Sequence, residues 1–256
     1  MVARTDRTTD PDLRAALLLA RRGQAYFSRK LNELANDELD APSLVPGWTR
    51  RHVVAHVGLN ARALTRLTEW AATGVETPMY ASREERDAEI EYGATQPARA
   101  LRNLSAHAAV HLNVEWRDLS DEAWRAQVRT AQGRVVPASE TVWMRTREVW
   151  VHAVDLDNGA SFRQFPAELV DALLADVTRL WRTRADAEGV VVPLLEPTDR
   201  PAGTAWGAVG PNGDDEGRPH LRGRAADLAQ WATGRGGGPQ LTSVDGSPVP
   251  PPPRWL

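Results

Sequence analysis

Apolar residues recur at steps of three and four through four separate stretches of the chain that precede Asp155. Such spacing gathers apolar side chains on one face of a helix, so each stretch is typical of an amphipathic helix. The predicted helices run from Pro11 to about Asn36, from Thr49 to about Thr73, from about Pro97 through Leu112, and from Ser139 toward Asp155. Gly74 stops the second helix. We predict that the four helices close as an antiparallel bundle.

A long connection follows Gly74 and separates the second and third predicted helices. It is rich in charged residues, among them Arg83, Arg86 and Asp87, and Pro78 interrupts it. Its pattern predicts a loop, and loops of this length often carry function. Its length also leaves open a bundle topology other than plain up-and-down.

The pattern changes after Phe165, where helical spacing gives way to shorter and more varied segments. Its expected parts, in chain order, are a helix through Leu169 and Trp181, the valine run 190–192, glycine-rich segments around Trp206 and Val209, a helix over 225–232, and an extended proline tail at 250–253. We therefore predict a second, smaller domain of α+β type. The predicted domains span 1–160 and 161–256, and the predicted fold class is α plus α+β.

The composition excludes several classes of partner and several kinds of chemistry. A net charge of −3 over 256 residues supplies no field that attracts nucleic acid or an anionic membrane. The longest early apolar run, 15–20, ends at two arginines, so neither a membrane span nor a signal peptide is expected. The chain has no cysteine, which excludes disulfides, thiolate metal sites and a thiol nucleophile of its own, and which suits a cytoplasmic protein.

Four ligand-type side chains form two pairs on the predicted helices. His52 and His56 lie four residues apart on the second helix, and Glu148 and His152 lie four residues apart on the fourth. This spacing puts both members of a pair on one helix face, so a pair that faces the bundle interior can bind one cation. Histidine and carboxylate ligands without cysteine are typical of a catalytic zinc or a similar divalent metal.

A structural role is the alternative for the same residues. His56 and His152 are then core histidines with satisfied hydrogen bonds, and Glu148 pairs with an arginine such as Arg145. Two such pairs on different helices favour the metal site over this alternative. Because four protein ligands would close a zinc site, and because His56 lies nearer the middle of the apolar stripe than His52, we leave His52 out of the predicted ligand set.

Several segments of the chain resemble known families. Gly47–Thr49, Val54–Val57 and Glu148–Asp155 are similar to the DinB-like metal-binding bundle. The longer strings Thr73–Tyr80, Ala131–Arg134, Val136–Thr141 and Pro252–Leu256 resemble the mycothiol-dependent maleylpyruvate isomerases. The DinB-like pattern is shared by many activities, whereas the longer strings favour the isomerases. The resemblance extends over almost the whole chain.

The resemblance implies a fold, a site and a reaction. It implies a zinc bound by His56, Glu148, His152 and water, and a C-terminal domain similar to sterol-carrier-protein folds. It also implies functional arginines at Arg86 and Arg235, which would hold the carboxylates of a small dicarboxylate substrate or its developing enolate. The implied reaction is the cis-to-trans isomerisation of maleylpyruvate to fumarylpyruvate in gentisate-type aromatic degradation. We expect a cytoplasmic monomer.

Mycothiol, the implied cofactor, is a low-molecular-weight thiol, and its use agrees with the absence of cysteine from the chain. A carbon–carbon double bond rotates only after it loses π character, and reversible addition of a sulfur nucleophile turns it into a single bond. The implied zinc would stabilise the thiol as thiolate, polarise a substrate oxygen, or do both.

Two other functions stay open at this point. A zinc-dependent mycothiol S-transferase of the DinB-like superfamily would share the metal and the thiol but would consume the thiol. A non-enzymatic, metal-stabilised binding module would keep the bundle and would not need Arg86 or Arg235.

Overall fold

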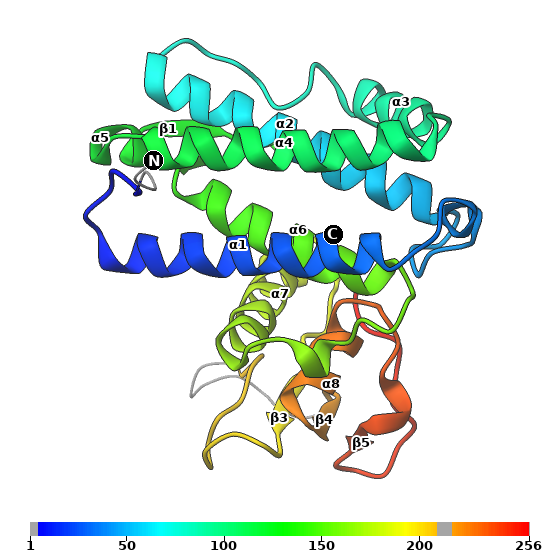
Figure 1. The fold of residues 1–256 in the computed structure, drawn as a ribbon. Coiled ribbons are helices and arrows are strands. Elements are labelled where there is room, and N and C mark those ends of the chain that lie inside the picture. The colour runs from blue at the N-terminus through cyan, green and yellow to red at the C-terminus, as the bar shows by residue number, and fades with distance from the viewer. Residues whose placement is uncertain (1–4, 209–216, 256) are drawn as a thin grey trace. The chain divides into compact units, whose positions relative to one another are not determined.

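The computed structural model describes residues 5–208 and 217–255 (Figure 1). The chain divides into two compact units, Met1–Ala160 and Ser161–Leu256. The first is a helical bundle with a small hairpin, and the second combines helices with a three-stranded sheet, so the predicted fold class is confirmed. Among the described residues, no helix is both long enough and apolar enough to cross a bilayer.

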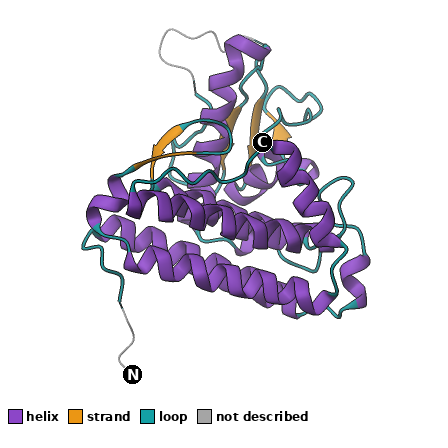
Figure 2. Ribbon diagram, turned by 90° about the horizontal axis from the view of Figure 1, so that it is seen from above, coloured by secondary structure: helices purple, strands orange, loops and turns teal. Residues whose placement is uncertain are grey.

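The described residues of the N-terminal unit form six α-helices and one hairpin. They are α1 (Pro11–Asn32), α2 (Arg50–Thr73), α3 (Arg83–Ala94), α4 (Ala98–Asp118), α5 (Asp121–Arg125), the antiparallel strands β1 (Gln127–Arg129) and β2 (Val135–Pro137), and α6 (Glu140–Asp155). A 3₁₀ turn, Asp37–Asp40, lies between α1 and α2. Figure 2 shows the long helices of this unit lying side by side.

The bundle core is built from the apolar stripes of its four long helices. Helix α2 packs along α4, α1 packs along α6, and α2 also contacts α6. Leu17, Leu64, Leu112 and Val142, one from each helix, are almost completely buried. Gly23 allows α1 and α6 to approach closely, because a Cβ atom there would lie only 2.4 Å from Nε1 of Trp150. These contacts fix α6 against α1 and α2.

The helix boundaries agree with the pattern at α2 and differ from it at α1. Helix α2 follows its N-cap Thr49 and ends at Gly74, whose φ of 75° is the left-handed conformation that glycine adopts readily. Helix α1 ends at Asn32 and not near Asn36, so the predicted end was wrong. The physical reason is a tighter final turn, in which the N–H of Leu34 bonds to Leu31 O at 3.3 Å.

The connection predicted to be a loop contains a helix, α3. The side chain of Ser82 caps it by accepting the N–H of Glu85 at 3.1 Å. The pattern does not reveal this helix, because only Ile90, Gly93 and Ala94 of it are buried, which is too narrow a stripe to be recognised. Arg86 therefore lies on a helix and not in a loop.

The described residues of the C-terminal unit form two α-helices and a small mixed sheet. Its elements are α7 (Ala167–Glu188), α8 (Ala225–Ala232), and the strands β3 (Leu194–Pro197), β4 (His220–Gly223) and β5 (Thr242–Ser243), with 3₁₀ turns at Phe162–Gln164 and Gly238–Gln240. The sheet order is β3-β4-β5, with β3 and β4 parallel and β4 and β5 antiparallel. Helix α8 contacts α7, β3 and β4. Val209 lies outside the described residues.

The proline tail lies against the C-terminal unit. Its backbone accepts the indole N–H of Trp181 at Pro253 O, 3.1 Å away, and that of Trp231 at Pro250 O, 2.9 Å away. Trp255 is itself buried. The tail therefore satisfies two buried indole donors that would otherwise lack these acceptors.

Candidate metal centre

Three of the predicted ligands converge inside the N-terminal unit. His56 comes from α2, and Glu148 and His152 come from one face of α6, one turn apart. Glu148 Oε2 lies 3.0 Å from His56 Nε2 and 3.1 Å from His152 Nε2. One ligand atom from each residue lies within 4.8 Å of the other two. The i, i+4 spacing on α6 and the packing of α2 on α6 together produce this cluster.

The cluster holds opposite charges in a buried setting. Burial alone would raise the pKa of Glu148, but hydrogen bonds and charge from His152 and His56 hold that pKa well below its usual range. Burial lowers the pKa of His56, and its bond to Glu148 offsets this only in part. An ionised carboxylate and a neutral imidazole are the forms in which these side chains bind a divalent cation.

Asp155 orients His152. Its carboxylate Oδ2 lies 2.8 Å from His152 Nδ1, and Asp155 is completely buried. Against the effect of burial, Asp155 and Glu148 raise the pKa of His152 to about 9. A carboxylate on the far nitrogen of a ligating histidine is the usual partner that fixes the ring, so that Nε2 faces the ion.

Arg86 stands at the edge of the cluster. Its Nη2 lies 3.5 Å from His56 Nδ1, and its Nη1 donates to Asp87 Oδ1 at 2.6 Å. Its guanidinium carbon lies 5.9 Å from the centre of the Tyr80 ring. Burial raises the pKa of Tyr80 to about 12, so its hydroxyl stays neutral near pH 7. The structure thus places a cation beside His56 and a neutral phenol next to that cation.

A buried arginine, Arg145, connects the helices that carry the cluster. Its guanidinium donates to Val57 O at 2.7 Å and to Asn60 Oδ1 at 2.9 Å on α2, and to Gln24 Oε1 at 2.8 Å on α1. Burial lowers the pKa of Arg145 to about 10, which leaves it charged near pH 7. Val57 follows His56 directly, and Arg145 lies one turn before Glu148, so these bonds set the spacing between the ligand-bearing helices.

The other two residues considered from the sequence lie elsewhere. The ring of His52 accepts the backbone N–H of Thr49 at 3.2 Å and lies 3.3 Å from Glu91, so it caps α2 and does not join the cluster. Arg235 belongs to the C-terminal unit, in the loop after α8, where its Nη1 donates to Thr233 O at 2.6 Å. A role for Arg235 at the site stays a prediction.

Sequence reasoning missed the roles of three residues around the cluster, although it considered Arg145 as a partner of Glu148. Asp155 had a usable signal, because a carboxylate three residues after a candidate histidine ligand shares its helix face. Arg145 has the same relation to Glu148, but its contacts on α1 and α2 depend on tertiary packing. Tyr80 had no such signal, since its place depends on α3, which the pattern did not reveal.

The comparisons with known proteins show the family of this chain. The sequence model of the mycothiol maleylpyruvate isomerase N-terminal domain matches residues 20–157. A crystal structure of a mycothiol-dependent maleylpyruvate isomerase is 45% identical to the chain, with a TM-score of 0.86, and the match covers 95% of this chain and 97% of that one. This chain belongs to the mycothiol-dependent maleylpyruvate isomerase family. A structure of a histidine-to-alanine mutant of such an isomerase matches with the same values.

The match to the N-terminal domain model includes every residue of the cluster. His56, Arg86, Glu148 and His152 all lie within the residues that the domain model matches, whereas Arg235 lies beyond them. No curated protein matches the chain.

Proposed function

We propose that this protein converts maleylpyruvate into fumarylpyruvate, with mycothiol as a catalytic thiol. The observation that carries the proposal is 45% identity to a mycothiol-dependent maleylpyruvate isomerase over 95% of the chain. The absence of cysteine supports it, because the sulfur nucleophile must then come from outside the chain. The thiol supplies reversible addition to the double bond, rotation about the resulting single bond, and elimination that returns it unchanged.

The proposed metal is zinc, with His56, Glu148 and His152 as its ligands. Two imidazoles and one carboxylate form a donor set that zinc binds, and three protein ligands leave a further position for water, thiol or substrate. The hydrogen bond between His152 Nδ1 and the carboxylate of Asp155 orients the imidazole, as a carboxylate normally does for a ligating histidine. When bound, zinc would supply a Lewis acid that stabilises anionic sulfur or oxygen near neutral pH.

Arg86 is the proposed anchor for a substrate carboxylate or for the enolate that develops during the reaction. Its guanidinium is already fixed by Asp87 and lies beside His56, so it directs positive charge to the edge of the cluster. A forked guanidinium binds a carboxylate through two parallel hydrogen bonds and thereby holds one orientation. Arg235 is proposed as a second anchor.

The setting we propose is the reducing cytoplasm, in a gentisate-type aromatic degradation sequence. A cysteine-free chain that uses an external thiol supports the reducing compartment. We propose that the protein acts as a monomer on a small dicarboxylate, because one chain supplies all three candidate ligands.

The test is isomerisation of maleylpyruvate by the zinc-loaded protein, followed by chromatography, with no thiol and with sub-stoichiometric mycothiol. We expect no turnover without the thiol, many turnovers per thiol with it, and recovery of free mycothiol at the end. A thioether product, formed once per substrate consumed, would instead show an S-transferase. Absence of any reaction under both conditions would favour a binding module.

A further inference from the structure

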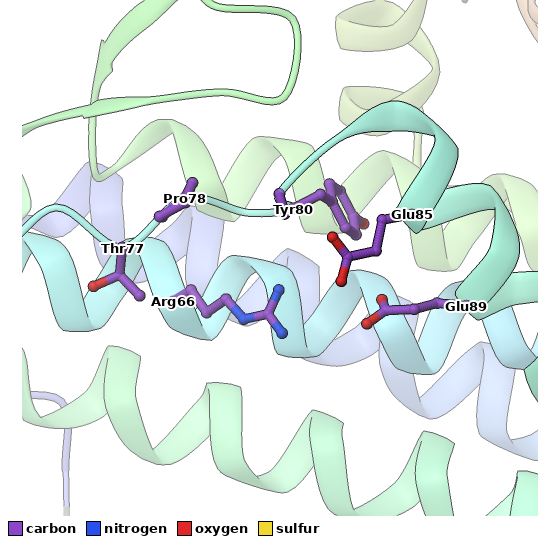
Figure 3. Close-up of a pocket in the computed structure, with 7 residues that line it drawn as sticks. Arg66, Thr77, Pro78, Tyr80, Glu85 and Glu89 are labelled. Atoms are coloured by element: carbon purple, nitrogen blue, oxygen red, sulfur yellow. The ribbon is translucent and has the colours of Figure 1, made fainter.

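A pocket outside the metal cluster lies between α2, the connection that follows it, and α3. Its volume is about 270 Å³, and its polar lining is supplied by Arg66, Thr77, Tyr80, Glu85 and Glu89. Figure 3 shows the carboxylates of Glu85 and Glu89 pointing toward the guanidinium of Arg66. The two glutamates lie four residues apart on one face of α3.

The lining is chemically suited to a neutral ligand with many hydroxyl groups. Two carboxylates accept hydrogen bonds from hydroxyls, and the guanidinium of Arg66, which donates to Met79 O at 2.6 Å, is held in place to donate others. The Tyr80 ring adds an apolar surface for the C–H face of a ring. Two negative charges against one positive charge disfavour a dicarboxylate there.

The pocket and the metal cluster share Tyr80 as a boundary. The Tyr80 ring lines the pocket, and the guanidinium of Arg86 lies 5.9 Å from its centre and reaches His56. On α3, Glu85 lines the pocket, whereas the adjacent Arg86 serves the cluster. Helix α3 therefore lies between the negatively charged pocket and the positively charged side of the cluster at Arg86. A molecule that extends past Tyr80 can contact both.

We propose that this pocket binds one hydroxylated ring of the thiol cofactor. Mycothiol is an N-acetylcysteine amide of a glucosaminyl-inositol, so it carries neutral hydroxylated rings at one end and the thiol at the other. The pocket is smaller than the roughly 300–1,000 Å³ typical of drug-sized ligands, which fits one ring and not the whole molecule. The thiol end then lies on the cluster side of Tyr80. This inference rests on the proposed function.

The test compares wild type with Glu85→Gln/Glu89→Gln, two isosteric changes that remove the charged acceptors and keep the size of the side chains. Calorimetry measures binding of N-acetylglucosaminyl-inositol, which lacks the thiol and, like mycothiol, has a neutral amide on its sugar nitrogen, and kinetics measure KM and kcat with mycothiol and with N-acetylcysteine. We expect the variant to weaken binding of N-acetylglucosaminyl-inositol and to raise the KM for mycothiol by about tenfold or more. Its kcat and its KM for N-acetylcysteine should stay at the wild-type values.

Glu84→Gln is the matched control, because Glu84 is exposed on the same helix and does not line the pocket. It should behave as wild type in every assay. Unchanged binding of N-acetylglucosaminyl-inositol and an unchanged KM for mycothiol in the double variant would overturn the proposal. Calorimetric binding does not require turnover. If the protein does not isomerise maleylpyruvate, the binding result still tests the pocket, so failure of the proposed function and failure of the pocket proposal are distinguishable.

Discussion

At the scale of single residues, the sequence contained enough to find the three candidate ligands but not the residues that support them. His56, Glu148 and His152 were predictable because helical spacing places each pair on one face and because polar side chains are costly to bury without partners. The contact of Asp155 with His152 follows from the same helix. Arg145 is different, because its acceptors lie on two other helices and only the packed bundle brings them together.

The first prediction is that the two histidines of α2 have different roles. We expect His56→Ala to lose bound zinc and isomerase activity together, because one of three candidate ligands is gone. His52→Ala should keep its zinc and lose only about 0.5–2 kcal/mol of stability, since its ring caps the helix. Elemental analysis and urea unfolding measure both effects. Stoichiometric zinc in His56→Ala, with none in His52→Ala, would contradict the proposed ligand set.

The second prediction concerns Arg145. Replacement by methionine leaves the buried acceptors on Val57, Asn60 and Gln24 without their donor, which should lower the free energy of unfolding by roughly 2–4 kcal/mol. Arg145→Lys should recover part of the loss, because an ammonium keeps the charge and some donors. Urea unfolding of the zinc-free proteins isolates this effect from metal binding. Equal stability of wild type and Arg145→Met would show that these bonds do not hold the helices.

At the scale of elements, prediction depended on how wide an apolar stripe each helix carries. Helix α2 was predictable, because Thr49 and Gly74 mark its ends and a broad apolar stripe runs between them. Helix α3 was not, because charged residues cover most of its surface and its few buried residues lie near its end. Because both Arg86 and the pocket glutamates lie on α3, the missed element is the one that shapes the surroundings of the cluster.

The third prediction concerns the segment before α1, which Asp6 and Arg21 hold in place. Arg21 donates to both Asp6 oxygens, at 2.7 and 2.5 Å, and to Asn113 on α4 at 2.7 Å. The hydrogen bond from Arg21 holds the pKa of Asp6 below its usual value. A depressed folded-state pKa adds stability above the unfolded pKa of about 3.9, and this stability is lost as pH falls through the folded-state pKa.

Wild type should therefore exceed Asp6→Asn in free energy of unfolding by about 0.5–1 kcal/mol near neutral pH, a value limited by solvent screening of this partly exposed pair. The difference should shrink as the pH falls below about 4. Urea unfolding across this range measures it, and Asp37→Asn, an exposed residue between α1 and α2, is the control. A difference that grows on acidification would contradict the assignment.

At the scale of the whole molecule, the chain combines a helical unit that contains the three candidate ligands with a smaller α+β unit. The change from broad helical stripes to short segments after Phe165 was visible in the sequence. The strand positions were not, because strands of two to four residues are too short to show a period. The β3 strand begins at Leu194, after the valine run and not within it.

The fourth prediction asks whether the C-terminal unit takes part in the reaction. Arg235→Ala should lower kcat/KM by about tenfold to a hundredfold and leave zinc content and circular dichroism unchanged, because its guanidinium is proposed to bind the substrate. Arg235→Lys should restore only part of the activity, since a point charge does not reproduce two parallel hydrogen bonds. Arg222→Ala, a largely exposed arginine on β4, is the control. Wild-type kinetics in Arg235→Ala would refute the role.

The bonds from Trp181 and Trp231 to the proline tail have a consequence for synthesis of the protein. The helical unit has its whole core in the first part of the chain, so it can fold while the ribosome is still translating the rest. The second unit lacks the acceptors at Pro250 and Pro253, and the buried Trp255, until these residues have been translated. A chain cut before residue 250 therefore has a complete first unit, while its second unit lacks these contacts and is a target for proteolysis.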